Sequence, residues 1–433
     1  MNRRTFIKQT AVALGALAAN DYGAIAATAI KTSAKQVSCI SMQKKPLAIA
    51  MWDFSWLLRH HGGGEFENWD SVLDGLVVRG YNAIRADAFP ALVAADTEGK
   101  IQEEYYFPRD TWKPVMWGNQ YSMRARPREG LLTFLPKCRE RGISVGLATW
   151  FMGPGVERVE GLDGFVRVWD ETLTLINDHK LMDNVLYVDL LNEYPMFHGF
   201  DWLKKKLESI KTQSLEKIEN PQDRQREANE WAKDAGGYNA AQQEYFRNFM
   251  SEAISRLRAK WPQLDFFASM TTTQLPWEDI IIKEFDALDI HVWYAMHDKL
   301  TGKTGYWENI HELGGTRNDN ELEPTQKNLT QNWLANRAVL NVWMDDQMTR
   351  VAALGRQFNV PYGNTEGWGL INWLDHPSLN WDIIKEAGEF CARRGAELGY
   401  RFNCSSNFTH PQFPRLWQDV AWHKKVTAII RGD

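Results

Sequence analysis

The chain contains 433 residues, of which 44% are hydrophobic and 24% are charged, and its formal net charge is −5. This balance is typical of a globular protein long enough for a large core, and it excludes the strongly basic surface with which proteins bind nucleic acids. Twenty tryptophans are an unusually high number. Their flat apolar rings predict either a Trp-rich core or platforms on which sugar rings stack.

Residues 1–29 do not fit a folded element. Arg3 and Arg4 precede an apolar run at 11–19, and small residues at 24–29 offer sites for signal cleavage. This pattern resembles a bacterial twin-arginine signal, which predicts the Tat export machinery as a partner and a periplasmic or secreted location. A disordered tail with a chance arginine pair is the alternative. The apolar run is too short for stable insertion into a membrane.

From residue 46 onward, short apolar runs alternate with longer amphipathic stretches. The apolar runs predict strands at residues 47–56, 81–89, 143–151, 185–191, 264–270, 287–294, 360–368 and 400–408. The amphipathic stretches predict helices at residues 69–80, 129–142, 161–182, 240–261, 332–358, 380–398 and 417–430. A charged insertion at 201–235 also has a helical pattern.

Strands and helices in strict alternation, with strands that are apolar on both faces, predict a fold of the α/β class. Eight such units favour a closed (β/α)8 barrel, a TIM barrel, whose active-site residues lie at the carboxyl ends of the strands. The barrel is expected over residues 46–433 as a single catalytic domain, after a linker at 30–45, with long βα-loop insertions at 91–127, 194–239 and 295–330. A doubly wound open sheet is the alternative, but no Gly-rich phosphate turn follows the first strand.

Polar and aromatic side chains occupy the ends of the predicted strands. They are Asp53, Arg85, Asp87, Trp150, Asn192, Glu193, His291, Trp293, Tyr294, Thr365 and Glu366. A single glutamate at such a position is most simply explained by an ion pair at the barrel rim or by a helix cap. Two glutamates on strands four and seven, together with an arginine and a histidine from strands two and six, favour a functional site.

Two carboxyl groups facing across a barrel mouth suit the cleavage of a glycosidic bond. One carboxylate attacks or stabilises the anomeric carbon, and a second, protonated carboxyl group serves the departing oxygen. A separation of about 5 to 5.5 Å leads to retention of configuration. We expect Arg85 to lower the pKa of one glutamate, and burial with a neighbouring carboxylate to raise that of the other. The amide of Asn192 suits a hydrogen bond to the sugar 2-hydroxyl group.

The order of these motifs resembles glycoside hydrolase clan A, which includes the family 5 cellulases and mannanases. An arginine on strand two, the pair Asn192-Glu193, His291 before an aromatic residue and the late Glu366 carry the resemblance. It extends over about residues 46–430 and is greatest to the proteins described as cellulase-like or sugar-binding cellulase-like.

The resemblance implies a role for each matching residue. Glu366 would be the nucleophile, Glu193 the acid/base and Asn192 the contact to the 2-hydroxyl group. The residues expected to bind the carbohydrate substrate or support the site are Asn192, Arg85, His291, Trp293, Tyr294, Asp53, Trp150 and Trp368. No cofactor is expected, and no catalytic metal either, because the adjacent pair His60-His61 does not suit one metal in the H-x-H arrangement that a barrel metallohydrolase needs.

The sequence departs from the family 5 pattern at three places. Tyr194 separates Glu193 from the proline that usually follows it directly, and at strand six the usual H-x-Y has become "HVW", with Tyr294 one position later. Strand eight carries no evident platform tryptophan in "NCSSNF". These departures affect the expected substrate more than the expected chemistry.

Six tryptophans lie near predicted strand ends, and two or three of them are expected to line sugar subsites. They are Trp52, Trp56, Trp150, Trp293, Trp368 and Trp373. The four cysteines have no metal-binding spacing, although Cys391 and Cys404 could pair in an oxidising compartment.

The sequence therefore favours an exported retaining β-glycosidase that acts by double displacement. A glycan-binding barrel with weak or no catalysis is the second hypothesis, and a metal-dependent barrel hydrolase is the third.

Overall fold

The eight predicted strands form one parallel sheet that closes on itself, in a computed structural model that describes residues 38–108, 122–196, 198–233, 238–272, 277–306, 319–369, 375 and 377–433. The twin-arginine signal expected at 1–29 and Trp373 lie outside the described residues. In chain order the sheet strands are β1 (Leu47–Asp53), β2 (Ala83–Asp87), β5 (Ser144–Ala148), β6 (Val185–Asp189), β7 (Asp265–Phe267), β8 (Met270–Thr271), β9 (Leu288–Trp293), β10 (Tyr362–Asn364), β11 (Gly367–Trp368) and β12 (Phe402–Cys404).

Two of the predicted strands are interrupted, and these interruptions allow the sheet to close. The fifth strand consists of β7, which pairs with β6, and β8, which pairs with β9. The seventh consists of β10, which pairs with both β9 and β12, and β11, which pairs with β9. Since β12 also pairs with β1, eight strand positions complete a circuit and the predicted (β/α)8 barrel is confirmed.

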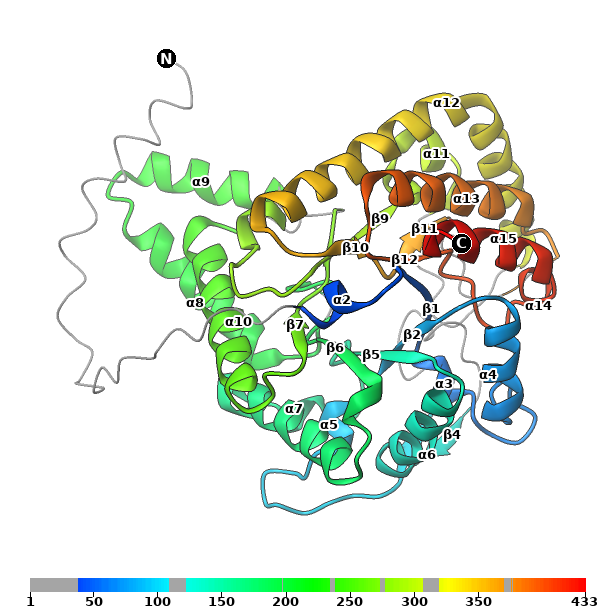
Figure 1. Cartoon of the computed structure of the whole chain (residues 1–433). Helices are drawn as coiled ribbons and strands as arrows, with labels where there is room; N and C mark the ends of the chain where they lie inside the picture. The colour runs from blue at the N-terminus through cyan, green and yellow to red at the C-terminus, as the bar shows by residue number, and fades with distance from the viewer. Residues whose placement is uncertain are drawn as a thin grey trace. The chain divides into compact units, whose positions relative to one another are not determined.

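Helices surround this sheet, as Figure 1 shows. They are α2 (Cys39–Met42), α3 (Ser55–Leu58), α4 (Trp69–Val78), α5 (Pro90–Val93), α6 (Pro127–Glu140), α7 (Gly161–Asp178), α8 (Asp201–Glu216), α9 (Pro221–Lys233), α10 (Ala240–Lys260), α11 (Asp298–Thr301), α12 (Asp319–Phe358), α13 (Trp381–Leu398), α14 (Pro414–Trp417) and α15 (Val420–Arg431). None of the described helices is both long and apolar enough to cross a membrane.

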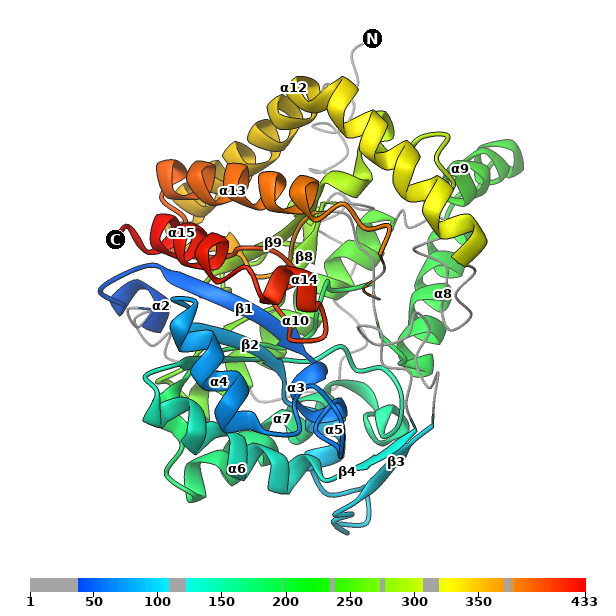
Figure 2. The same ribbon diagram turned by 90° about the vertical axis from the view of Figure 1, so that its right-hand side faces the viewer.

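The loops at the carboxyl ends of the strands hold structure that the sequence pattern did not indicate. In the segment expected to be a polar loop, β3 (Tyr105–Phe107) and β4 (Met123–Ala125) form an antiparallel pair. Figure 2 shows this pair on the same side of the barrel as α3 and α5. α12 begins 13 residues earlier than predicted, at Asp319 rather than residue 332, and continues through Pro324.

The barrel interior is filled by side chains, so the strand ends rest on a packed core. The Tyr187 ring lies beside the Phe267 ring, with 5.1 Å between centroids, and Phe267 stacks on Phe402 at 6.5 Å. Gly146 on the neighbouring strand makes room for Tyr187, because a Cβ atom there would lie 1.9 Å from the tyrosine ring. These rings form a rigid layer within the barrel.

The opposite end of the barrel carries α2, within the range expected to be a linker. Asp265, the first residue of β7, accepts hydrogen bonds from the hydroxyl of Ser38 at 2.5 Å and from the backbone N–H groups of Cys39 and Ile40, both at 2.9 Å. Ile40 is completely buried. This short helix is therefore packed against the barrel.

Candidate active site

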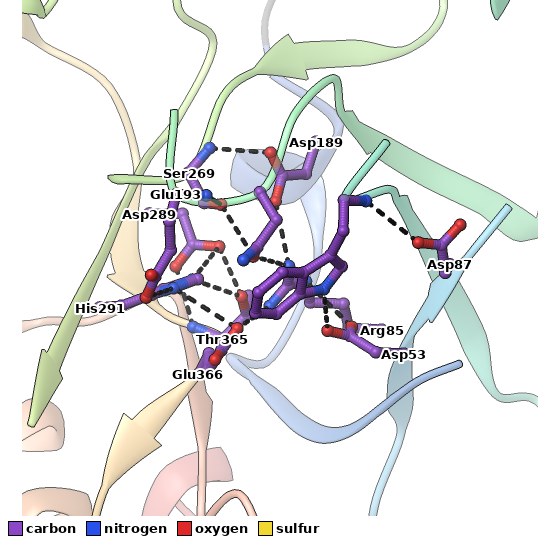
Figure 3. A network of polar contacts seen from close by, with 12 residues as sticks. Asp53, Arg85, Asp87, Asp189, Glu193, Ser269, Asp289, His291, Thr365 and Glu366 are labelled. Carbon is purple, nitrogen blue, oxygen red and sulfur yellow. Dashed lines mark hydrogen bonds and ion pairs between the residues drawn. The ribbon is translucent and has the colours of Figure 1, made fainter. Parts of the chain in front are cut away.

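Charged and polar side chains from most of the strands meet at the carboxyl end of the barrel (Figure 3). Each is at least 95% buried, and the group comprises Asp53, Arg85, Asp87, Asp189, Asn192, Glu193, Ser269, Asp289, His291, Thr365 and Glu366. The sequence predicted that the strand ends would bring Arg85, Asn192, Glu193, His291 and Glu366 together, and the structure places them in one hydrogen-bonded network.

Arg85 occupies the centre of this network. Its Nη1 donates to Glu366 Oε2 at 2.9 Å, and its Nη2 lies 3.3 Å from Asp189 Oδ2 and also donates to Asn192 Oδ1. Its Nε lies 3.5 Å from Asp53 Oδ1. One guanidinium thus connects strands one, two, four and seven, which suits a planar group with several fixed donors.

His291 lies between the two glutamates. Its Nδ1 is 3.0 Å from Glu193 Oε1 and 3.5 Å from Glu366 Oε2. On the other side of the ring, Nε2 is 3.6 Å from Asp289 Oδ2 and 3.4 Å from the hydroxyl of Thr365. Because both ring nitrogens face carboxylates, the network favours a protonated imidazolium with Nδ1 directed at the glutamate pair.

The two glutamates are close enough to act on one bond. A carboxylate oxygen of each and one ring nitrogen of His291 all lie within 4.8 Å of one another. Among the described residues, these three side chains also have the geometry to hold a metal ion, as a histidine and two carboxylates. The same separation is suited to a pair of catalytic carboxyl groups acting without a metal.

Burial has a larger effect on the pKa of the Glu366 carboxyl group than the neighbouring cations do. It raises the pKa of Glu366 to about 8, assisted by the charge of Glu193, although His291 and Arg85 lower it. Arg85 lowers the pKa of Glu366 as expected, but the expectation that it keeps this nucleophile ionised is wrong, because removal of the carboxyl group from water shifts the pKa upward. Burial alone would lower the pKa of His291, but Glu366 and Asp289 raise it to about 10.

The backbone at the barrel mouth adopts a conformation that residues other than glycine rarely take. Asp53, Phe89, Phe151 and Glu193, which follow or end four adjacent strands, have φ angles of 34°, 48°, 45° and 46°. A residue held in this left-handed region costs on the order of 1–3 kcal/mol, and such positions are concentrated at functional sites. The strained positions therefore coincide with the mouth that holds the carboxylates.

Asp53 and Trp150 meet at the edge of the network. The indole N–H of Trp150 donates to Asp53 Oδ2 at 2.7 Å, and its backbone N–H donates to Asp87 Oδ2 at 3.1 Å. Trp150 is only half-buried, and its ring lies 5.8 Å from that of Phe54. Of the described tryptophans predicted near strand ends, it is the one with an exposed portion.

The other described tryptophans of that set are buried. Trp52, Trp56 and Trp368 each donate the indole N–H to a backbone carbonyl oxygen, of Thr409, Asp87 and Cys404 respectively, at 2.9 Å. Trp293 is 2% exposed at the end of β9. Trp52, Trp56 and Trp368 thus have the contacts of core residues, and the structure does not connect Trp368 to the charged network.

Tyr294 also faces away from the glutamates. Its hydroxyl donates to Asn341 Oδ1 of α12 at 2.8 Å and lies 4.0 Å from the Cys391 sulfur. The ring packs edge-on against Trp333, also of α12. Its one-position displacement from the usual motif places it after the end of β9, in the short 3-10 turn Tyr294–Met296. All four cysteines are free, so Cys391 and Cys404 do not pair.

Sequence reasoning missed three residues of the network. Asp289 lies two positions before His291, and the alternation of a strand directs both side chains to the same face. Asp189 is the charged residue within the apolar strand that precedes Asn192. These two carried a signal in the sequence, whereas Ser269, in the break between β7 and β8, carried none.

A closed parallel barrel with these side chains at its carboxyl end defines a glycoside hydrolase-like protein. The family model described as "Cellulase-like: Sugar-binding cellulase-like" matches residues 49–431. The chain therefore belongs to the sugar-binding cellulase-like family, and the resemblance found in its motifs is confirmed.

One solved structure of the same fold and two more distant ones are similar to this chain. A candidate glycoside hydrolase from Parabacteroides distasonis ATCC 8503 is 28% identical, with a TM-score of 0.73, and the match covers 89% of this chain and 94% of that one. An endoglucanase is 11% identical, with a TM-score of 0.48 and coverage of 92% and 100%. An endo-1,4-β-D-mannanase from Thermotoga petrophila RKU-1 is 10% identical, with a TM-score of 0.44 and coverage of 83% and 87%. A search of curated proteins gives no match.

Proposed function

We propose that this protein is an exported retaining β-glycoside hydrolase that cleaves O-glycosidic bonds of oligo- or polysaccharides. The observation that carries the proposal is the closeness of Glu193 and Glu366, whose facing atoms lie within 4.8 Å across the barrel mouth. Retaining enzymes hold their carboxyl groups about 5–5.5 Å apart, whereas inverting enzymes hold them about 6.5–9.5 Å apart to admit a water molecule. Membership of a cellulase-like family supports a glycan as substrate.

In the proposed first step, a carboxylate oxygen of Glu366 attacks the anomeric carbon and forms a glycosyl ester. The bond to the leaving oxygen breaks, and Glu193 gives its proton to that oxygen. In the second step, Glu193 takes a proton from water as the water attacks the same carbon, and the ester bond to Glu366 breaks. The catalyst is restored and the configuration is retained.

The surrounding residues support this division of roles. Arg85 donates to Glu366 and favours its anionic form, which the attack requires. His291 contacts both carboxyl groups, so it provides a route by which one proton is shared between them. Asn192 Nδ2 is buried with no hydrogen-bond partner among the described residues, which leaves it available to a sugar hydroxyl group.

A panel of aryl β-glycosides and polysaccharides would identify a substrate, and two variants would then test the roles. Glu366→Ala should abolish turnover with the fold intact, and Glu193→Gln should lower kcat by about 10²–10⁴-fold on substrates with poor leaving groups. Product NMR should show retention. Inversion, or near wild-type activity of Glu366→Ala on every cleaved substrate, would exclude the double displacement.

We also propose that the chain is exported through the Tat pathway to the periplasm or beyond. The support is the Arg3-Arg4 pair with the apolar and small residues that follow it. Fractionation of cells that produce the wild type and an Arg3→Lys/Arg4→Lys variant tests the proposal. The variant should stay in the cytoplasm, and equal export of both forms would contradict a twin-arginine signal.

Glycan binding without efficient catalysis is the second candidate function. It is favoured by the pKa of about 8 at Glu366, because a protonated carboxyl group at neutral pH does not attack. Calorimetric binding of oligosaccharides with no product across the panel, between pH 5 and pH 9, would support this candidate over hydrolysis.

A further inference from the structure

Ser269 occupies the gap between β7 and β8, where the strand leaves β6 and joins β9. Its polar groups are therefore free of the sheet ladder, and they bond to the segment that follows β6. The backbone N–H donates to Asp189 Oδ1 at 2.8 Å, and the carbonyl oxygen accepts from Tyr194 N at 2.9 Å. The side chain is completely buried at the barrel mouth (Figure 3).

The hydroxyl group of Ser269 contacts the backbone of Glu193, the side chain of Asn192 and the Asp189 carboxyl group. Glu193 N–H donates to Ser269 Oγ at 3.0 Å, so this oxygen is an acceptor. As a donor, the hydroxyl group is directed at Asn192 Oδ1, 3.3 Å away, and at the carboxyl group of Asp189 beside it. One hydroxyl group thus holds the backbone of Glu193 and the side chain of Asn192 together.

This contact determines which end of the Asn192 amide faces the substrate. Ser269 and Arg85 both donate to Oδ1, so the oxygen end is fixed toward them. The Nδ2 end is left buried and without a partner among the described residues. Two donors on one oxygen make the reversed amide unfavourable, since it would bring N–H groups against N–H and O–H donors.

The contact also stabilises the strained turn that carries Glu193. Glu193 has a φ of 46°, and Ser269 bonds both its N–H and the next one, of Tyr194. Two successive peptide groups are therefore anchored to one residue. Loss of the hydroxyl would let the turn relax and move the Glu193 carboxyl away from its position beside His291.

We propose that Ser269 is a positioning residue that sets both the Glu193 carboxyl group and the Asn192 amide for the reaction. This inference rests on the proposed function, because it assigns Ser269 the task of placing the proton donor and the 2-hydroxyl contact. Ser269 does not touch the reacting atoms itself.

Ser269→Ala tests the first half of the proposal through its dependence on the leaving group. On phenyl β-glycosides of the sugar that the wild type cleaves, kcat/KM should fall by up to about 100-fold, the loss expected from a small misplacement. On the matching 2,4-dinitrophenyl glycosides, whose aglycone leaves without a proton, the loss should be clearly smaller. An equal loss on both aglycones, or no loss, would overturn the role of Ser269 in placing Glu193.

The second half is tested with 2-deoxy substrates. The wild type should prefer a 2-hydroxy substrate over its 2-deoxy analogue, and Ser269→Ala should reduce this preference because the amide is no longer fixed. An unchanged preference would overturn the role of Ser269 in placing Asn192.

Two further variants separate positioning from folding. Ser405→Ala is the matched control, because Ser405 is also buried at a strand end but its hydroxyl lies 2.5 Å from that of Tyr81, away from the site. Ser405→Ala should show the same dependence on the leaving group as the wild type.

If Ser269→Ala fails to fold, Ser269→Cys preserves the side-chain shape. It should show the leaving-group dependence that is expected of Ser269→Ala. A wild type that cleaves no glycoside contradicts the proposed function. If the wild type is active, but Ser269→Ala loses the same activity on both aglycones and keeps the 2-hydroxyl preference, only this inference is contradicted.

Discussion

Individual carboxyl groups at the barrel mouth cannot all be ionised at neutral pH. Five of them lie beside two cations in a space from which water is excluded, and removal from water disfavours the ionised form of a carboxyl group unless a cation compensates. The carboxyl groups are Asp53, Asp189, Glu193, Asp289 and Glu366, and the cations are Arg85 and His291. Burial raises the pKa of Asp53 and brings that of Asp189 to about 6. The residues of this network therefore titrate together, and the protons that it binds are shared among them.

Replacing Arg85 should reveal how much this network depends on its cation. Arg85→Met leaves several buried carboxylates unpaired, a change that typically costs about 3–5 kcal/mol. The cost should be greatest above pH 7 and should nearly vanish below about pH 4, where the carboxyl groups are protonated in both the folded and the unfolded state. Urea unfolding of the variant and the wild type across this range measures the difference.

Arg79→Met is the matched control for that experiment. Arg79 is also buried, but it donates to the carbonyl oxygens of Trp417 and Gly75 and stacks on the Trp417 ring. Its loss leaves no unpaired carboxylate, so its cost should change little with pH. A similar pH dependence for both variants would contradict the assigned role of Arg85.

The raised pKa of Glu366 predicts a shift in the activity profile. Glu366 has a pKa of about 8, and the charge of Glu193 is one cause of that increase. Glu193→Gln removes this charge, so the pKa of Glu366 should fall and the attacking anion should be present at lower pH. The acidic limb of kcat/KM, measured on a 2,4-dinitrophenyl glycoside, should therefore move to lower pH. A limb that stays in place or moves upward would contradict the coupling of the two carboxyl groups.

At the scale of elements, the sequence predicted the eight strands and the carboxyl edge on which the site lies. It could do so because strands buried on both faces are short apolar runs, and because the main helices of the barrel carry amphipathic patterns. It did not predict that strands five and seven are interrupted. Those breaks depend on which neighbour each half pairs with, and that pairing is a property of the closed sheet.

The residues of the site also divide into those that the sequence indicated and those that it did not. Glu193 and Glu366 were found because each lies at the carboxyl end of a predicted strand. The contacts of Ser269 could not be found, because they arise from a gap in one strand and the turn after another. Tyr294 was assigned to the site from its motif, but it lies just after the end of β9, and its hydroxyl group bonds to α12. The direction of the pKa shift of Glu366 required the depth of its burial, which sequence does not specify.

The short helix α2 should contribute to the stability of the barrel. Ile40 is completely buried beside the hydrogen bonds to Asp265, so Ile40→Ala should cost about 2–5 kcal/mol of the free energy of unfolding. Met42, on the same helix, is 58% exposed, and Met42→Ala should change stability by less than about 0.5 kcal/mol. Thermal unfolding of both variants tests this, and equal stability of the two would show that the helix is only loosely attached.

For the whole molecule, buried titratable groups should place the maximum of stability at mildly acidic pH. Burial raises the pKa of Asp87 and of Glu366 to about 8, and charged neighbours raise that of His291 to about 10 despite its burial. A group with a raised folded pKa contributes stability that is complete below its unfolded pKa, about 4 for carboxyl groups and 6.5 for histidine, and that is lost as pH rises through the folded value. Stability should therefore fall from about pH 6 toward pH 10.

Two buried histidines limit stability from the acidic side. Burial lowers the pKa of His410 to about 3 and that of His423 to about 4, so their contribution to stability is complete above about pH 6.5 and is lost as pH falls through those values.

Denaturant unfolding from pH 4 to pH 10 should show a maximum of stability near pH 5–6. Asp87→Asn should reduce the decline between pH 5 and pH 8 by up to about 1.4 kcal/mol per pH unit, since in this range one proton is no longer taken up on folding. The exposed Asp178, at the end of α7, provides the control Asp178→Asn, which should leave the slope unchanged. Stability that rises steadily from pH 6 to pH 9 would contradict the upward pKa shifts of the buried carboxyl groups, and with them the proton sharing on which the proposed pair of catalytic glutamates depends.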